Sequence, residues 1–494
     1  MTSLKVQLEE IARSAPGRLA VQFKDRQLTY SDVVDSVRRL EATIGRLDGM
    51  RILTILPDSF AAYLVTLYCF ITKAALVPVS IRSVSPQIER ICERISPHLI
   101  ITTEILYKAH QDILKERASL IIKQQDFFSG HNFSFDFLGN DFLPTLPVTS
   151  AAQPEDIQLI LFTSGTTGTP KGVCLSEYNI LAAASMMVDF LSLGPDRRSL
   201  VTVPLYDYYG LIQIFGHILA ATGFIFGENM TLPGDLFRRI THGQATDLVL
   251  VPYTLRRMFE ILGKQASDVT RALKVITSSS DILSDDLLRC AFELNPALRV
   301  FNIYGLTEAG RACYREIVAF SPASKSVGHP SRGVEIQIDG DEREPGEIVI
   351  RGPNVMRGYF DAIRSDRVTF SPCHEVRTGD LGYFDENGEI VLVGRSDHMI
   401  SLMGMKIHPS EVEAIALAAP DILEAHAYAS ETQPGHPSVW LDVVPSGSQV
   451  DKSGLLRRMR NGLPRAFVPT AINVVDKISR TELGGKILRK KVKS

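Results

Sequence analysis

Short apolar segments typical of buried strands alternate with segments of helical length through roughly the first 390 residues, and this alternation constrains the fold most strongly. Strand-like segments include RILTILP (51–57), TDLVLVP (246–252) and LRVFNIYG (298–305), and helix-like segments include SPQIERICERI (85–95). Strands that follow one another through helices are typical of parallel pairing. The pattern therefore predicts an α/β fold with layered, mostly parallel sheets.

The pattern changes from about residue 325, where short strands are separated by Gly, Pro and Asp turns. GEIVIRGP (346–353) and GEIVLVG (388–394) are examples, and they predict a small β subdomain. After GRSD (394–397) follows a compositionally distinct unit with a helix, PSEVEAIALAA (409–419), strands and a basic tail. We therefore predict an N-terminal domain over 1–394 and a smaller α+β C-terminal domain over 398–494.

Composition excludes several classes of protein. The chain has 494 residues, 45% of them hydrophobic and 22% charged, and a formal net charge of -3. This balance argues against nucleic acid or an anionic lipid surface as the main partner. The six cysteines are scattered without metal-like spacing, which is typical of reduced thiols in a cytosolic enzyme.

The longest apolar stretch, AAYLVTLYCFITKAALVPV (61–79), raises the question of a membrane span. Thr66 and Lys73 interrupt it, so we expect a buried helix that leads into a strand, and no membrane span. The N-terminus carries acidic residues and lacks the apolar core of a signal peptide. We expect a cytoplasmic protein.

The segment LILFTSGTTGTPKGV (159–173) combines a buried strand with a loop rich in glycine and hydroxyl groups. Such a loop can turn backbone N–H groups and hydroxyls onto one anion. It is not a P-loop, because Pro170 stands where the second glycine is required and Gly172 follows the lysine. The residues that we expect to hold phosphate are Thr163, Ser164, Gly165, Thr166, Thr167, Gly168 and Lys171.

This segment resembles the phosphate-loop motif of the adenylate-forming ligases, which include acyl-CoA synthetases, peptide-synthetase adenylation domains and luciferases. Further motifs of that superfamily follow in order and cover essentially the whole chain. They are ITKAALVPVS (71–80), YGLTEAG (304–310), GEIVIRGPNVMRGYF (346–360), RTGDLG (377–382), GRSDHMISLMGMKIHPSEVE (394–413) and SRTELGGKILRKKV (479–492).

The resemblance implies that a carboxylate and Mg²⁺-bound ATP react to give an acyl-adenylate and pyrophosphate. Catalysis of an attack by one anion on another must come mainly from positioning and positive charge. The loop would hold the β- and γ-phosphates of ATP. By resemblance, Thr307 would bond to the α-phosphate, Glu308 would bind Mg²⁺, and Tyr304 would pack on the adenine. Gly305 would also belong to the nucleotide site.

Four residues nearer the C-terminus complete the implied machinery. Asp380 would accept hydrogen bonds from both ribose hydroxyls, and Arg395 would lie beside the ribose and phosphate. Lys486 matches the lysine that bridges the carboxylate and the α-phosphate. In this superfamily the C-terminal domain is mobile and pivots near the residue matching Asp397, so we expect a hinge at 395–397. His398 departs from the family, which often has a second Asp there.

The acid pocket departs most from the family. Tyr206–Asp207 replaces a common aromatic–His pair, and Ser279–Ser280–Asp281 replaces Gly-Gly-Ala. The added hydroxymethyl groups narrow the pocket and make it more polar, which favours a compact polar or aromatic acid, or an amino acid. The expected pocket residues are Asp207, Tyr208, Gly210, Ser279 and Ser280.

Asp207 supports three interpretations: a counter-ion for an amine on the substrate, a base for an acceptor amine, or a structural carboxylate. The acceptor stays open at this point. GMKIHPSEVE (404–413) is closest to acyl-CoA synthetases and favours a CoA or carrier-protein phosphopantetheine thiol. Met403, where several CoA-using relatives have a small residue, and Asp207 favour an amine acceptor, as in stand-alone amide bond synthetases. The presence of Lys486, Glu308 and Asp380 argues against an inactive binding protein.

We predict that Lys486→Ala abolishes acyl-adenylate formation but spares transfer from a supplied acyl-adenylate, because the lysine is needed only while the carboxylate meets the α-phosphate. Pyrophosphate exchange and product formation from synthetic acyl-adenylate measure the two steps separately. Lys490→Ala, in the same basic tail, is the control and should retain both. Equal loss of both steps in Lys486→Ala would contradict this role.

Overall fold

The computed structural model describes residues 2–123, 135–138, 157–163, 171–227, 233–281, 283–321, 325–340, 345–361, 375–396, 400–402, 405–407, 409–433, 436–447, 449–463 and 465–478. The chain divides into two compact units. Unit 1 comprises Met1–Pro322, Gly328–Glu335 and Ile350–Val376, and unit 2 comprises Ala323–Val327, Ile336–Val349 and Arg377–Ser494. This division groups 377–394 with the C-terminal part of the chain, and the hinge at 395–397 stays a prediction.

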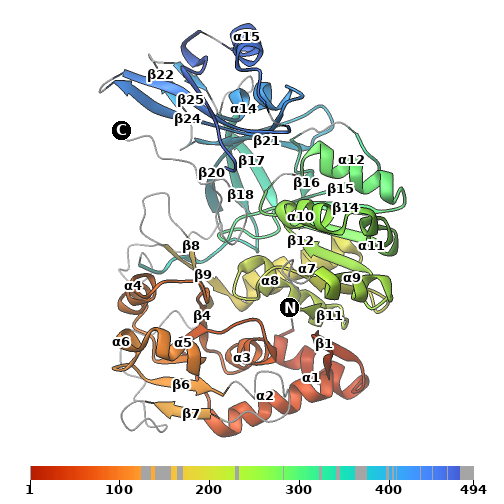
Figure 1. The fold of residues 1–494 in the computed structure, drawn as a ribbon. Coiled ribbons are helices and arrows are strands. Elements are labelled where there is room, and N and C mark those ends of the chain that lie inside the picture. Colours follow the sequence, from red (N-terminus) through yellow and green to blue (C-terminus); the bar gives the residue numbers. More distant parts are fainter. Residues whose placement is uncertain are drawn as a thin grey trace. The chain divides into compact units, whose positions relative to one another are not determined.

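The larger sheet of unit 1 has nine strands in the order β16-β15-β14-β13-β12-β10-β11-β1-β2 (Figure 1). Its six central strands pair in parallel, and β2, β15 and β16 are antiparallel additions at the two edges. The strands are β1 Leu19–Phe23, β2 Arg26–Thr29, β10 Arg198–Val201, β11 Gly223–Phe226, β12 Asp247–Leu250, β13 Val275–Ser279, β14 Arg299–Tyr304, β15 Cys313–Ile317 and β16 His329–Pro330.

The second sheet of unit 1 has eight strands in the order β19-β9-β8-β4-β3-β5-β6-β7. Strands β8, β4, β3, β5 and β6 pair in parallel, as the alternating pattern predicted. The strands are β3 Arg51–Ile55, β4 Ala75–Pro78, β5 Leu99–Thr103, β6 Ser119–Ile122, β7 Phe135–Leu138, β8 Ile157–Thr163, β9 Lys171–Ser176 and β19 Gly358–Tyr359.

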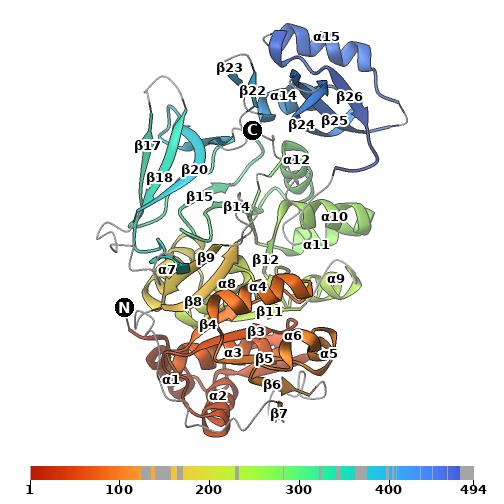
Figure 2. The same cartoon turned by 90° about the vertical axis from the view of Figure 1, so that its left-hand side faces the viewer.

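Helices separate and cover these sheets. Because side chains alternate across a strand, Leu248 and Leu250 join the core beneath α9–α12, whereas Val249 joins the core on the opposite face. Figure 2 shows α9–α12 along the larger sheet. The helices are α1 Leu4–Ser14, α2 Tyr30–Ile44, α3 Phe60–Ile71, α4 Ser85–Ile95, α5 Glu104–Ala109, α6 Gln111–Leu114, α7 Glu177–Leu191, α8 Tyr208–Leu219, α9 Pro233–Thr241, α10 Pro252–Leu262, α11 Ala266–Ala272 and α12 Asp285–Leu294, with a 3₁₀ turn at Gly263–Gln265.

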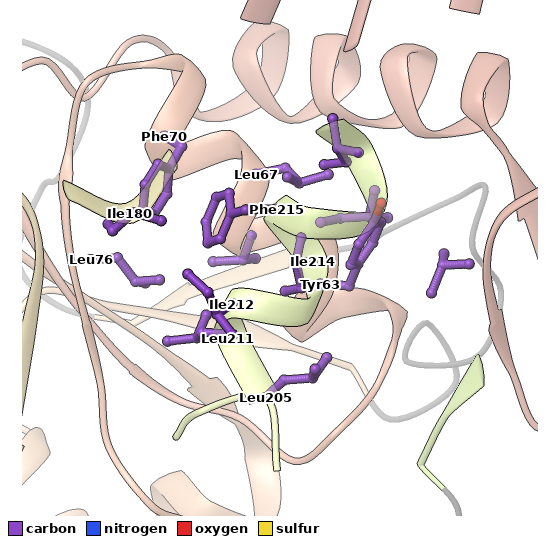
Figure 3. Close-up of a cluster of buried hydrophobic side chains, with 14 of the residues drawn as sticks. Tyr63, Leu67, Phe70, Leu76, Ile180, Leu205, Leu211, Ile212, Ile214 and Phe215 are labelled. Carbon is purple, nitrogen blue, oxygen red and sulfur yellow. The ribbon is translucent and has the colours of Figure 1, made fainter. Parts of the chain in front are cut away.

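A shared core lies between the two sheets and contains α3, α7 and α8. Side chains of Leu76 from β4 and of Phe224 and Phe226 from β11 belong to the same cluster. Figure 3 shows Phe70 of α3 beside Phe215 of α8, and their ring centroids are 4.6 Å apart. Because α3 packs on almost all sides, its sequence is apolar all round rather than amphipathic.

The apolar stretch 61–79 is thus a buried helix followed by a strand, as predicted. Helix α3 begins after Ser59, whose Oγ accepts the N–H of Ala62 at 3.2 Å, and it has twelve residues. Within the residues that the structure describes, no helix is long and apolar enough to cross a bilayer.

Unit 2 contains most of a four-stranded sheet in the order β17-β18-β20-β21, and a three-stranded sheet of β24, β25 and β26. Helices α14 and α15 pack on the three-stranded sheet in a core of their own. The strands are β17 Glu335–Asp339, β18 Gly346–Arg351, β20 Glu375–Phe384, β21 Ile390–Arg395, β22 Ile400–Leu402, β23 Met405–Ile407, β24 Ile422–Gln433, β25 His436–Pro445 and β26 Ala471–Val474; the helices are α14 Pro409–Leu417, α15 Lys452–Gly462 and a 3₁₀ turn at Arg465–Phe467.

Candidate active site

The predicted phosphate loop connects two antiparallel strands of the second sheet. Thr163 ends β8 and Lys171 begins β9, and the two residues are paired across the strands. The hydroxyl of Thr163 lies 3.5 Å from the carbonyl oxygen of Lys171. The hairpin therefore fixes both ends of the loop, while Ser164, Gly165, Thr166, Thr167 and Gly168 lie outside the described residues.

Tyr359 connects Lys171 with Glu308. Strand β19 pairs with β9, which places Tyr359 opposite Val173, and the Lys171 ammonium lies 4.9 Å from the centroid of the Tyr359 ring. The Tyr359 hydroxyl donates to Glu308 Oε1 at 3.0 Å. The expected phosphate-binding lysine and the expected magnesium ligand thus contact one aromatic side chain. Sequence reasoning missed Tyr359 as a site residue, although the quoted motif 346–360 contains it.

Tyr304 ends β14, and the turn that follows carries Gly305, Thr307 and Glu308. Two backbone hydrogen bonds between Leu306 and Ala309 close it, and the Glu308 carbonyl accepts the N–H of Met356 at 2.8 Å. A Cβ on Gly305 would lie 2.7 Å from the Arg311 backbone nitrogen, so this position requires glycine. The turn follows the carboxyl end of a parallel strand, where α/β sheets usually bind ligands.

Glu308 fits the expected role of a magnesium ligand. Mg²⁺ is commonly held by one or two carboxylates together with substrate phosphates and water, so a single oriented carboxylate is a sufficient protein contribution. Among the described residues, no cluster of three His, Cys, Asp or Glu side chains could hold a metal without such a substrate.

Asp380 and Arg395 lie together in unit 2. They are paired across β20 and β21, and Arg395 Nη1 lies 3.1 Å from Asp380 Oδ1. Gly379 has a φ of 72°, and a Cβ there would lie 2.8 Å from Arg395 Nη2, so glycine is required beside the pair. The structure thus brings these two predicted residues into contact, and their roles at ribose and phosphate stay predictions.

Asp207 lies at the start of α8 and forms a pair of buried carboxylates with Asp58. It precedes that helix and its side chain makes no capping bond there. Removal from water and, to a smaller extent, the charge of Asp58 raise the pKa of Asp207 to about 7, while Arg82 opposes the shift. Asp58 accepts the N–H of Leu205 at 2.9 Å, and burial raises the pKa of Asp58 to about 6. Sequence reasoning missed Asp58, which lies far from Asp207 in the chain.

The other predicted pocket residues lie in two places. A Cβ on Gly210 would lie 2.0 Å from the Pro204 carbonyl oxygen, so α8 starts in close contact with the preceding loop. The Ser279 hydroxyl donates to the Ile303 carbonyl at 2.9 Å, whereas Ser280 is exposed and adopts a left-handed φ of 78°. Such a φ favours glycine, which is the family residue that Ser280 replaces.

Lys486, Asp397 and Met403 lie outside the described residues, so their predicted roles stay predictions.

Comparison with known proteins identifies the family. The family model described as "AMP-binding enzyme" matches residues 8–360. The chain is 27% identical to the indoleacetate–CoA ligase of Aromatoleum aromaticum, covering 95% of this chain and 93% of that protein. It is 29% identical to the sulfoacetate–CoA ligase of Cupriavidus necator, covering 71% of this chain and 70% of that protein.

Solved structures have the same fold. The O-succinylbenzoate coenzyme A synthetase of Bacillus subtilis in complex with AMP superposes with a TM-score of 0.79 at 21% identity, covering 99% of this chain and 98% of that one. The amide bond synthetase McbA of Marinactinospora thermotolerans superposes with a TM-score of 0.80 at 22% identity, covering 98% of each chain. The fold class predicted from the motifs is confirmed. The chain belongs to the AMP-binding enzyme family, and it is an adenylate-forming ligase.

Proposed function

We propose that this enzyme activates a compact polar or aromatic carboxylic acid with ATP and Mg²⁺ and then transfers the acyl group to the thiol of CoA or of a carrier-protein phosphopantetheine. In the first step a carboxylate oxygen bonds to the α-phosphorus and the bond to pyrophosphate breaks. In the second step the thiolate sulfur bonds to the acyl carbon and AMP leaves. The observation that carries the proposal is the contact of Tyr359 with both Lys171 and Glu308.

The chain's own residues supply position and charge. Lys171 holds the negative charge of the departing pyrophosphate, and Thr307 donates its hydroxyl to the α-phosphate. Bound Mg²⁺ neutralises phosphate charge, and Glu308, fixed by the Tyr359 hydroxyl, is the residue that would hold it. The preference for a thiol acceptor rests on relatives named as CoA ligases, one of which is matched over nearly its whole length.

The test is to offer a panel of compact acids with ATP and to measure acid-dependent ATP–pyrophosphate exchange, then to add CoA or a set of amines and identify products by mass. We expect exchange, followed by an acyl-CoA thioester. Failure to exchange with any acid would contradict adenylation, and amides formed without thioester would contradict the thiol acceptor.

Tyr359→Phe should lower the rate of adenylation by about 10-fold and raise the Mg²⁺ concentration needed for half-maximal rate, because Glu308 loses the hydroxyl that orients it. The ring remains under Lys171, so the KM for the acid should change little. Pyrophosphate exchange at several Mg²⁺ concentrations measures this. Tyr383→Phe, at an exposed tyrosine, is the control. An unchanged Mg²⁺ dependence in Tyr359→Phe would show that the hydroxyl does not position Glu308.

A second candidate, direct transfer to an amine, is favoured by Asp207. An ammonium group must lose a proton before it attacks an acyl-adenylate, and a carboxylate with a pKa of about 7 is a suitable base at neutral pH. The base must be ionised to accept the proton, so amide formation should rise with pH through about 7.

Asp207→Asn should therefore lower amide formation by at least about 100-fold and remove this rise with pH, while sparing thioester formation. Asp58→Asn is the matched comparison. It keeps an acceptor for Leu205 but removes the charge that raises the pKa of Asp207, so the rise should move to lower pH. The rate of product formation between pH 5 and 9 measures both. Equal loss with amine and thiol acceptors would contradict a role as base.

A further inference from the structure

Arg311 is a buried cation without a counter-charge. It follows Gly310 and is 3% exposed. In the part of the chain that the structure describes, no acidic side chain pairs with it, and its Nε has no hydrogen-bond partner. Its Nη2 lies 3.9 Å from the Met187 sulfur, and its Cζ lies 4.6 Å from the centroid of the Tyr209 ring. These soft contacts orient the guanidinium but do not neutralise it.

Other largely buried arginines of unit 1 are neutralised. Arg197 contacts Asp247 at 2.8 Å, and Arg239 contacts Asp25 at 3.4 Å. Removing a guanidinium from water is costly unless an anion and hydrogen bonds compensate. Burial accordingly lowers the pKa of Arg311 from its ordinary value. The free energy of burying an unpaired guanidinium is offset by a carboxylate at Arg197 and Arg239 but not at Arg311. We infer that the anion for Arg311 comes from outside the chain.

Tyr208 supplies a second unsatisfied donor beside Arg311. Its buried hydroxyl has no hydrogen-bond partner among the described residues. Its ring packs directly on the chain at Gly310, where a Cβ would lie 2.0 Å from the ring. The charge of Arg311 acts on Tyr208 strongly enough to oppose the rise in its pKa that burial causes. A hydroxyl without an acceptor therefore lies close to a guanidinium whose Nε has none.

This pair lies close to the residues expected to act on the reacting carboxylate. Thr307 precedes Arg311 by four residues, so their Cα atoms are at most about 14 Å apart. The turn is more compact than that limit, because Gly305 approaches the Arg311 nitrogen closely. Thr307 and Arg311 therefore belong to one short turn.

We propose that Arg311 and Tyr208 bind a second anionic group of the acid substrate, so that the substrate is a short dicarboxylic or sulfonated carboxylic acid. This rests on the proposed adenylation of a compact acid and specifies its class. One carboxylate is activated at Thr307 and Glu308. The distal group accepts hydrogen bonds from the guanidinium and from the Tyr208 hydroxyl, and its charge neutralises Arg311.

The experiment compares acids in matched pairs by ATP–pyrophosphate exchange: malonate and sulfoacetate against propionate, succinate against butyrate, and phthalate against 2-methylbenzoate. We expect kcat/KM for at least one diacid or sulfonated acid to exceed that of its partner by at least about 100-fold. Arg311→Met should lower this ratio by at least about 100-fold, Arg311→Lys should retain part of it, and Tyr208→Phe should lower it less than Arg311→Met.

The thermal midpoint separates recognition from a structural role. Arg311→Met removes an unneutralised buried charge, so the midpoint without ligand should stay the same or rise. Arg197→Met is the matched control: it leaves the buried carboxylate of Asp247 unpaired, so the midpoint should fall while the selectivity ratio stays unchanged. The proposal would be overturned if the wild-type enzyme prefers the monoacids. It would also be overturned if Arg311→Met lowers kcat/KM equally for both acids of a pair.

Absence of exchange with every acid would contradict the proposed function rather than this subsite. In that case calorimetric titration with the same diacids decides: binding that Arg311→Met abolishes supports the subsite, and no binding to the wild type overturns it.

Discussion

The close approach of the chain to itself at residues 304–311 is the constraint on which the candidate site depends. Gly305 and Gly310 have no Cβ, and a Cβ at either position would meet neighbouring atoms at 2.7 Å or less. On one side of the turn, the segment 356–359 fixes Glu308 through a backbone bond and the Tyr359 hydroxyl. On the other side, Tyr208 packs against Gly310. One tight turn therefore positions residues expected at the nucleotide and residues expected at the acid.

Local patterning was sufficient to predict the strands, the buried helix α3 and the parallel pairing, because buried strands and helices leave periodic or continuous apolar runs in the sequence. The motifs singled out the ends of the phosphate loop, the 304–308 turn, Asp380 and Arg395, whose roles at the nucleotide stay predictions. Contacts between distant segments were not predictable. Asp58 is hydrogen-bonded to Leu205, 147 positions away, and Tyr359 to Glu308, 51 positions away. The sequence around each residue contains no pattern that indicates its partner.

Arg311 was missed for a different reason. In the sequence, Arg311 is an ordinary arginine that follows a motif. Its candidate role depends on the lack of an acidic partner around its buried side chain. Only the folded chain shows that Met187 and Tyr209 surround it while no described acid does. Ser280 is a parallel case, because a serine that replaces glycine suggests a narrower pocket, but only the backbone shows that it occupies a left-handed position.

Buried charged groups without a contacting counter-charge lie at the start of α8 and on the turn that packs against it. The charge of Asp58 raises the cost of ionising Asp207, while Arg311 has no acid partner in the described chain. A protein selected only for stability would bring the opposite charges together, as it does at Arg197 and Asp247. Keeping the carboxylates and the guanidinium apart leaves each able to meet a complementary group on a small molecule. Under the proposed function, the carboxylates would suit a cation or a proton and the guanidinium would suit an anion, and a long apolar acid would complement neither.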